Sequence, residues 1–161
     1  MNKPYLLIGG NLGNREFNLA RASDYINQLC GRVTQFSSLY ETAAWGKTDQ
    51  PSFLNQALEI ETKLDAEELM RQALEIESLM GRERNEKYGS RIIDIDILLF
   101  NDEQYNLPFL KIPHPEMQNR RFALTPLAEI AGGVQHPILK KSIDQLLEKC
   151  PDQLQVKKYF A

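Results

Sequence analysis

The 161-residue sequence is poor in cysteine, has no excess of basic residues and contains no long apolar run. Its two cysteines, Cys30 and Cys150, form neither a C-x-x-C pair nor a metal-ligand spacing, so we expect a reduced, cytoplasmic protein. The apolar runs at 5–8 and 97–100 fall far short of the roughly 18–20 residues that span a membrane. The first residues also lack a signal-peptide pattern, and no membrane association is expected.

Basic residues are too few for a protein that coats nucleic acid. Nineteen basic against 22 acidic residues give a net charge of −3, so no nucleic-acid partner is expected. Local basic clusters at 82–91 and 120–121 instead suit a small anionic ligand. With 42% hydrophobic residues, 25% charged residues and no linker or repeat, the chain is predicted to form a single domain over 1–161.

Hydrophobic periodicity and turn residues predict an alternation of strands and helices. Strands are expected at 5–8, 33–41, 53–62 and 91–100, helices at 19–29 and 65–80, and long loops at 42–52 and 81–90. Asp65 with Glu68 resembles a capping box at the start of the second helix. Beyond residue 100 the chain is expected to be irregular as far as 118. Short helices at 126–131 and 142–149 and a closing strand at 156–160 are predicted after that.

The order strand, helix, strand, strand, helix, strand over 5–100 is typical of the split βαβ pattern of a ferredoxin-like fold. The predicted class is α+β, with an antiparallel sheet, both helices on one face, active-site loops on the other, and C-terminal additions. A doubly wound α/β fold is less favoured because the second and third strands are adjacent in the sequence. An irregular α+β sheet is a further alternative.

The strand predicted at 91–100 carries acidic residues in a very apolar setting. Alternation places one set of side chains on the face that suits the helices, namely Ile93, Ile95, Ile97 and Leu99. Asp94 and Asp96 then share the other face, about 6–7 Å apart along the strand. Two carboxylates this close repel each other unless a positive charge lies between them, and Mg²⁺ is a natural partner. The alternative is a solvated sheet face on which Arg or Lys pairs with the acids.

The loop that leads into this strand carries Arg82, Arg84, Lys87 and Arg91. Arginine matches phosphate oxygens, and carboxylates beside clustered arginines are what a Mg²⁺-nucleotide site needs. A solvent-exposed charged loop is the alternative. No Walker A motif is present, because the glycine-rich run at 9–13 lacks the Lys-Ser/Thr pair. We interpret that run as a tight strand-to-helix turn that also allows close approach of a ligand.

Phe53 and Asn55 lie on one face of the strand predicted at 53–62. A ring for stacking beside an amide with donor and acceptor suits a flat heterocycle, although the two are equally a core aromatic and an edge polar group. His114, shortly before Arg120, is a candidate phosphate donor, whereas His136 is predicted to be structural.

Residues 87–98, with the sequence KYGSRIIDIDIL, resemble the signature of the 6-hydroxymethyl-7,8-dihydropterin pyrophosphokinase family. Further blocks in the order of the family lie at 9–12, 50–55, 77 with 81–84, and 113–122. Together these blocks cover nearly the whole chain, and the R-x-x-D-x-D block is highly specific in this setting.

The resemblance implies a folate-pathway enzyme that transfers pyrophosphate from ATP to the hydroxymethyl group of the dihydropterin and releases AMP. It implies two Mg²⁺ ions on Asp94 and Asp96, with Arg82 and Arg91 as the mobile and fixed catalytic cations. The implied pterin contacts are the side chains of Phe53, Asn55 and Phe122 and backbone groups of Thr42, Ala43 and Trp45. The implied ATP contacts are Glu77, Arg84, Tyr88, Ile97, Lys111, His114 and Arg120. The expected partners are ATP and the dihydropterin, and the expected state is a monomer.

Two other functions remain open on the residues alone. A nucleotidyltransferase also uses a D-x-D pair with Mg²⁺-nucleotide, but it usually adds an upstream Gly-Ser and a third carboxylate, which we do not find convincingly. A ferredoxin-like ligand-sensing or RNA-binding module would explain the fold. It gives no reason for Asp94 and Asp96, since RNA binders expose aromatic side chains on such a sheet.

Overall fold

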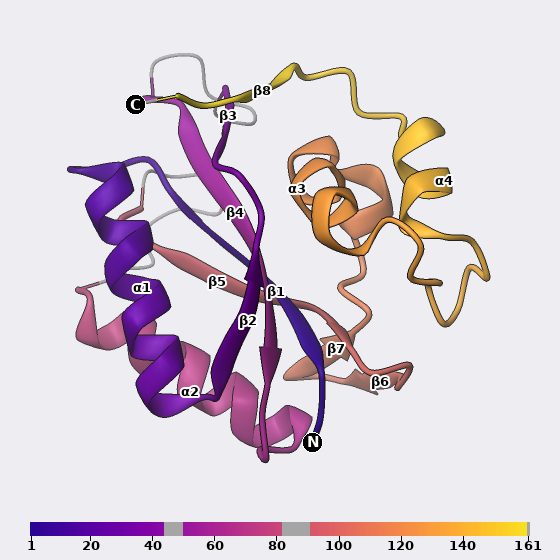
Figure 1. The fold of residues 1–161 in the computed structure, drawn as a ribbon, viewed down its shortest axis with the longest axis horizontal. Helices are drawn as coiled ribbons and strands as arrows, with labels where there is room; N and C mark the ends of the chain where they lie inside the picture. The colour runs from indigo at the N-terminus through magenta and orange to yellow at the C-terminus, as the bar shows by residue number, and fades with distance from the viewer. Residues whose placement is uncertain (44–49, 82–90, 161) are drawn as a thin grey trace.

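The computed structural model describes residues 1–43, 50–81 and 91–160. These residues form a mixed α and β fold with a six-stranded antiparallel sheet, a two-stranded hairpin and four α-helices (Figure 1). The large sheet contains β1 (Pro4–Gly10), β2 (Arg32–Phe36), β3 (Tyr40–Thr42), β4 (Phe53–Glu61), β5 (Asp94–Phe100) and β8 (Val156–Lys158), and the hairpin contains β6 (Tyr105–Leu107) and β7 (Leu110–Ile112). The helices are α1 (Arg15–Leu29), α2 (Ala66–Leu79), α3 (Arg121–Ala131) and α4 (Ile143–Glu148), with a 3₁₀ helix, η1 (Met117–Asn119), before α3.

The strand order across the large sheet is β5-β1-β4-β3-β8, and β2 pairs with β4 beyond the end of β3. Every pair is antiparallel. β5 is therefore an edge strand whose outer side is free of other strands in this sheet. That open edge is where the candidate site lies.

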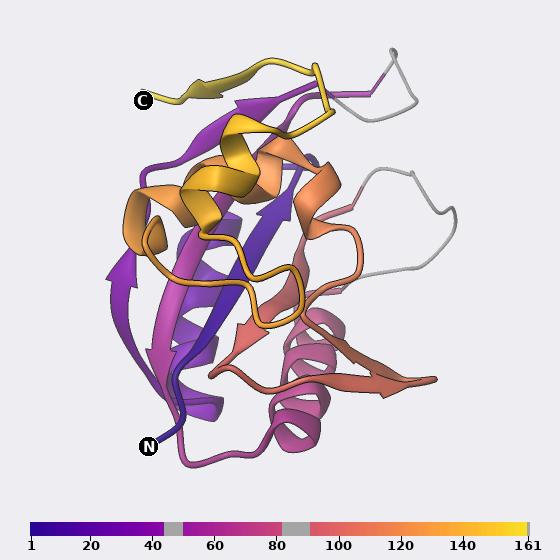
Figure 2. The ribbon, with the colours of Figure 1, turned by 90° about the vertical axis from the view of Figure 1, so that its right-hand side faces the viewer.

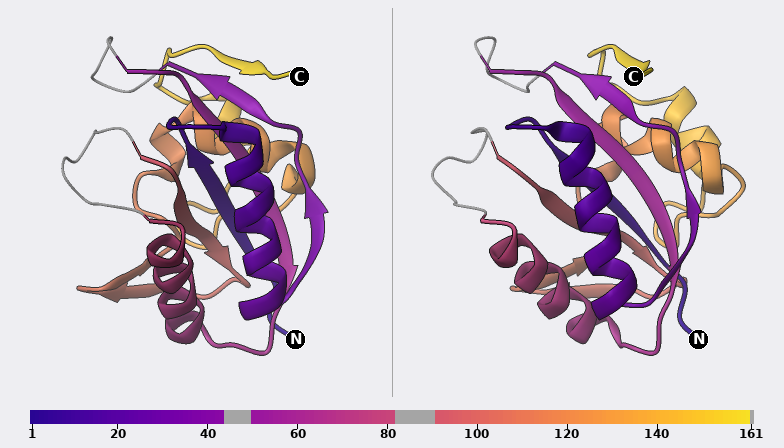
Figure 3. Two further views of the ribbon diagram at one scale, coloured as in Figure 1. Left: turned by 90° about the vertical axis from the view of Figure 1, so that its left-hand side faces the viewer. Right: turned by 60° about the vertical axis from the view of Figure 1, so that its left-hand side comes forward.

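α1 and α2 pack on one face of the sheet (Figure 3). Each begins at a side-chain cap that satisfies a free backbone N–H. Asn14 Oδ1 accepts from Phe17 N at 3.1 Å, and Asp65 and Glu68 form the reciprocal capping box that the sequence predicts. The fully buried Leu6, Ile8, Ile26, Leu54, Leu58, Ile60, Leu69 and Ile76 form the centre of this layer.

The opposite face is not left to loops alone. α3 and α4 cover much of it, as Figure 2 shows, and bury a second apolar cluster that includes Tyr5, Leu7, Leu124 and Leu127. α3 is also tied to β3, because the hydroxyl of Tyr40 donates to Glu129. The prediction of a face free for loops and ligands is wrong for this part of the sheet. Side chains of the C-terminal half complete the core there.

The strand predicted at 33–41 is two strands, β2 and β3, with a break at 37–39. Ser37 causes the break, because its hydroxyl accepts the hydrogen bond of Ala57 N at 2.9 Å in place of a backbone carbonyl. The three residues between Phe36 and Tyr40 then stand opposite only two on β4, between Leu58 and Asn55, and the register shifts by one.

β5 begins at Asp94, three residues later than predicted, and contains a bulge. Tyr5 is opposite Leu99 and Leu6 is opposite Ile97, so Leu98 is an extra residue in β5. Leu98 and Leu99 both enter the cluster beneath α3 and α4. The alternation therefore holds for Ile93, Ile95 and Ile97, but the prediction that Leu99 shares their face is wrong.

The segment after β5 is more regular than predicted. Residues 101–118 contain the β6–β7 hairpin, and α3 begins at Arg121, well before the predicted 126–131, with Pro126 inside it. The predicted helix at 142–149 and closing strand at 156–160 correspond to α4 and β8. None of the helices in the described ranges is long and apolar enough to cross a bilayer.

Candidate active site

A cavity of about 510 Å³ runs along the open edge of β5, between the second sheet face, α2 and the β6–β7 hairpin. Of the predicted site residues, Trp45, Arg82, Arg84 and Tyr88 lie outside the described residues. All the others line this cavity: Thr42, Ala43, Phe53, Asn55, Glu77, Arg91, Asp94, Asp96, Ile97, Lys111, His114, Arg120 and Phe122. The structure brings together residues more than 70 positions apart in the sequence. Their individual roles remain predictions.

The floor of the cavity is a row of residues across three strands. Asp94 on β5 is opposite Gly9 on β1, and Gly9 is opposite Asn55 on β4. Residues directly opposite each other in an antiparallel sheet point to the same side. The carboxylate and the amide therefore face the same space, about 10 Å apart over two strand spacings.

Gly9 leaves room in the middle of this row. A Cβ atom at Gly9 would lie 2.0 Å from Asn55 Oδ1, so only glycine lets the amide lean over β1. A Cβ atom at Gly10 would meet the carbonyl oxygen of Ile92 at 2.1 Å. The glycine pair is needed mainly for close approach of other protein groups, which refines the interpretation of a tight turn open to a ligand.

The acidic end of the cavity combines Asp94, Asp96 and Arg91. Arg91 Nη1 lies 2.7 Å from Asp94 Oδ2, and the two side chains are only 16% and 24% exposed. Asp96 is opposite Leu7, on the same face as Asp94. The pairing of an acid with arginine, which the sequence offers as the alternative to a metal site, therefore occurs at Asp94.

The donor set at this end fits Mg²⁺. Within the described segments no group of three or more His, Cys, Asp or Glu residues is placed to hold a metal ion. A cation bound by Asp94 and Asp96 would take its other ligands from phosphate oxygens and water, which is the coordination that Mg²⁺ prefers at nucleotide sites.

His114, Arg120 and Lys111 line the cavity from the segment after β5. Burial, assisted by the nearby Arg120 charge, lowers the pKa of His114 from 6.5 to about 4, so the ring is neutral at pH 7. Its Nδ1 accepts from Glu116 N at 3.2 Å, which leaves Nε2 to carry the proton. His114 can thus donate one hydrogen bond to a phosphate oxygen without carrying a charge.

The lowered pKa of the partly buried His114 predicts a pH-dependent stability. The unfolded chain protonates this ring near pH 6.5 and the folded protein near pH 4, so stability is lost as the pH falls through that window. Relative to wild type, His114→Gln should lose less stability between pH 7 and 4.5, by about 2–3 kcal/mol, in urea titrations. His136, whose pKa burial also lowers, is present in both proteins. Equal losses in the two proteins would show that His114 titrates normally.

Thr42, Ala43, Phe53 and Phe122 line the remaining side of the cavity. Thr42 is buried, and its hydroxyl is the one buried side-chain polar atom in the described residues that has no hydrogen-bond partner. Such an atom is costly in a ligand-free pocket and is well placed to bind a polar ligand. From the sequence, only backbone contacts with the pterin are expected of Thr42. No pattern in the sequence indicates a role for its hydroxyl.

The end of the cavity beside α2 and the β6–β7 hairpin is apolar. Most of the residues that line it were not predicted as site residues from the sequence. Met70 and Leu74 of α2 and Phe109 of the hairpin line it, beside the predicted Ile97. Leu74 and Phe109 are exposed at 44% and 53%, so both are open to contact with a ligand in the cavity. Neither residue type distinguishes a ligand-facing position from a core position in the sequence.

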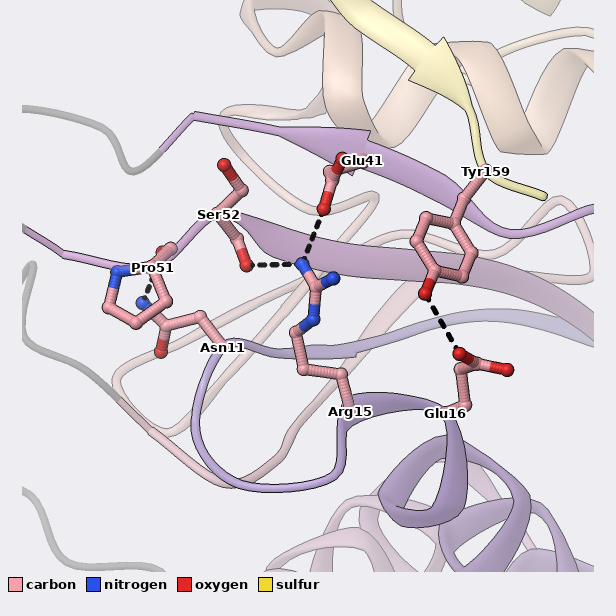
Figure 4. Close-up of polar contacts among 7 residues, drawn as sticks. All are labelled: Asn11, Arg15, Glu16, Glu41, Pro51, Ser52 and Tyr159. Atoms are coloured by element: carbon pink, nitrogen blue, oxygen red, sulfur yellow. Dashed lines mark hydrogen bonds and ion pairs between the residues drawn. The ribbon is translucent and has the colours of Figure 1, made fainter. Parts of the chain in front are cut away.

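Two polar side chains, Glu77 and Asn11, hold parts of this site together through hydrogen bonds that were not predicted from the sequence. The buried Glu77 accepts a hydrogen bond from Ile95 N at 2.7 Å, which anchors α2 to the edge of β5. Asn11 accepts from Arg91 N at 2.9 Å through Oδ1. Its Nδ2 donates to the carbonyl oxygen of Pro51 at 2.9 Å, the contact drawn in Figure 4. Asn11 thus joins the segments that flank the cavity on two sides.

Comparison with known proteins places this arrangement in a family. Residues 5–132 match the model of 7,8-dihydro-6-hydroxymethylpterin-pyrophosphokinase (HPPK). The chain belongs to the HPPK family. The matched range contains every residue that lines the cavity.

Curated relatives agree with this placement, and a solved structure shares the fold. The chain is 42% identical over 145 residues to 2-amino-4-hydroxy-6-hydroxymethyldihydropteridine pyrophosphokinase of Bacillus subtilis, covering 89% of this chain and 87% of that one. The enzyme of the same name from Pseudomonas aeruginosa is 35% identical, with 94% and 93% covered. The crystal structure of Plasmodium falciparum HPPK-DHPS superposes with a TM-score of 0.75 at 20% identity, covering 92% of this chain. This chain spans only 43% of that longer protein, and the likeness concerns the fold alone.

Proposed function

We propose that the cavity along β5 is the active site at which this chain performs the HPPK reaction. The chain transfers pyrophosphate from ATP to the hydroxymethyl group of hydroxymethyldihydropterin, in folate biosynthesis. The observation that carries the assignment to this cavity is the row Asp94–Gly9–Asn55. It sets a carboxylate for the phosphate end and an amide for the heterocycle on one side of the sheet.

Two Mg²⁺ ions are proposed to bind with ATP at Asp94 and Asp96. Bound there, they would neutralise phosphate charge at the reacting centre. Arg91 is proposed to face the triphosphate, with His114 and Arg120 as donors around it, and Lys111 is proposed to lie near the adenosine. Arg82, Arg84 and Tyr88 belong to this proposal from the sequence, outside the described part of the chain.

The pterin is proposed to lie between Phe53 and Phe122, with Asn55 at its polar edge. Thr42, Ala43 and Trp45 would supply further contacts, and the unpartnered Thr42 hydroxyl supports a polar ligand on this side. The apolar end with Leu74, Phe109 and Ile97 is proposed for the adenosine. Glu77 then acts there mainly through its bond to Ile95 N.

Asn55→Ala should weaken pterin binding and leave Mg-ATP binding nearly unchanged. Without the amide, polar edge atoms of the pterin stay unpaired in a buried pocket, at a cost of about 1–3 kcal/mol. Calorimetry with each ligand separately measures both affinities. Gln56→Ala, on the next position of β4 and pointing to the other face, is the matched control. Equal weakening of both ligands in the Asn55 variant would count against this specific role.

The function is tested by incubating the chain with ATP and the hydroxymethyldihydropterin, with and without Mg²⁺. AMP that forms only in the presence of Mg²⁺ supports the proposal. Nucleotide incorporation with release of pyrophosphate would indicate a nucleotidyltransferase, and binding without turnover would indicate a ligand-sensing module.

The finer structural and cellular assignments are also proposals. The strand order β5-β1-β4-β2, with α1 and α2 on one face, supports a ferredoxin-like arrangement with C-terminal additions. We propose a cytoplasmic monomer with ATP and the dihydropterin as its ligands.

A further inference from the structure

Arg15, the first residue of α1, does not line the cavity. It joins the end of β3 to the start of β4, and both of these strand ends line the cavity. Its Nη1 lies 2.6 Å from Glu41 Oε2 and donates to the carbonyl oxygen of Ser52 at 2.9 Å (Figure 4). Glu41 directly precedes Thr42 in β3, and Ser52 directly precedes Phe53 at the start of β4. Thr42 and Phe53 are register partners, and both line the cavity.

Tyr159, in the C-terminal segment, packs against this contact. The ring centroid of Tyr159 lies 5.5 Å from the guanidinium carbon of Arg15. Tyr159 is itself held at two points, because its N–H donates to Leu39 O and its hydroxyl donates to Glu16 Oε1, each at 2.8 Å (Figure 4). We name Arg15, Glu41, Ser52 and Tyr159 the clasp.

The clasp is stronger than an ordinary surface ion pair. The side chains of Arg15 and Glu41 are 22% and 35% exposed, whereas those of the Arg71–Glu67 pair on α2 are 65% and 44% exposed. Charge-assisted hydrogen bonds gain strength as water is excluded, and stacking on Tyr159 removes water from one side of the guanidinium. An exposed pair such as Arg71–Glu67 contributes little.

We infer that Arg15 is a positioning residue for the pterin side of the active site. By holding Glu41 and the Ser52 carbonyl with one nitrogen, it fixes the spacing of the β3 and β4 ends and so the places of Thr42 and Phe53. The nucleotide side has an anchor outside the clasp, since the guanidinium of Arg91 lies 2.7 Å from Asp94 Oδ2 on β5. Loss of the clasp should therefore weaken binding of the pterin and leave the affinity for ATP near wild type. The inference rests on the proposed function.

Arg15→Ala is expected to raise the dissociation constant of the dihydropterin about tenfold, equivalent to about 1.4 kcal/mol. The affinity for Mg-ATP and the rate at saturating pterin should stay close to wild type, which a general folding defect would not allow. Calorimetry with each ligand and steady-state kinetics measure the split. Arg21→Ala is the matched control, because it removes the same side chain from an exposed position of α1 outside the clasp.

Two further variants sharpen the test. Arg15→Lys keeps the charge but not the planar fork, so its pterin affinity should fall between those of Arg15→Ala and wild type. Glu41→Ala removes the partner carboxylate and should show the same split if Arg15→Ala does not fold. The inference is overturned if Arg15→Ala and Glu41→Ala bind the pterin with wild-type affinity. It is also overturned if they lose affinity for the pterin and for Mg-ATP equally. Absence of AMP formation by the wild-type chain would instead overturn the proposed function.

Discussion

Asp96→Ala should turn over about two to three orders of magnitude more slowly than the wild-type chain. The reason is the loss of a carboxylate at the position proposed to hold Mg²⁺ against the reacting phosphates. The fold should survive, because Asp96 is only partly buried and faces the cavity, away from the apolar layer of Ile95 and Ile97. Relief of repulsion with Asp94 is expected to leave the melting temperature unchanged or slightly raised.

The matched control for this experiment is Asp102→Ala. Asp102 is an exposed acid in the turn after β5 and does not line the cavity, so its loss should not slow turnover. Steady-state rates at saturating substrates and thermal melts of both variants make the measurement. Near-normal turnover of the Asp96 variant would remove the metal assignment.

Arg91→Ala should lower ATP affinity and turnover together. A hydrogen bond to a charged group is worth about 1.5–3 kcal/mol, so the affinity for Mg-ATP should fall at least about tenfold. Arg91 is held in place before ATP binds, because its N–H and carbonyl oxygen bond to Asn11 and its guanidinium bonds to Asp94. A fixed cation of this kind contacts the phosphates in the ground state and in the transition state alike.

Arg82→Ala, on the loop predicted at 81–90, should behave differently. If that arginine reaches the phosphates mainly in the transition state, turnover falls while ATP affinity stays near wild type. Single-turnover kinetics and equilibrium ATP binding on both variants separate the two patterns, and Arg71→Ala on the exposed side of α2 is the control. Intact ATP binding in Arg91→Ala would contradict its fixed role.

Local sequence rules predicted most of the elements that frame the site. The capping box at Asp65, the alternation from Ile93 to Ile97 and the glycine run that begins at the end of β1 all depend on neighbours within a few residues. The bulge at Leu98 does not, because it is set by how β5 pairs with β1. The β6–β7 hairpin was missed because its strands have only three residues each, too few for a period to appear.

The site shows the same division. Asp94, Asp96, Asn55 and Phe53 were identified because their residue types stand out against apolar strands, and all four line the cavity. The contacts of Arg15 join residues 26 and 37 positions away, and those of Asn11 with Arg91 span 80 positions. No local pattern encodes such pairs. The sequence can therefore propose the chemical groups of this site, but only the fold shows what holds them in place.

In the HPPK reaction both terminal phosphates of ATP leave together for the pterin. ATP labelled at the γ-phosphate, incubated with Mg²⁺ and the hydroxymethyldihydropterin, tests this transfer when the products are separated. We expect unlabelled AMP and a pterin diphosphate that carries the label, in equal amounts. Labelled inorganic phosphate with ADP, or labelled free pyrophosphate with an adenylylated pterin, would contradict it.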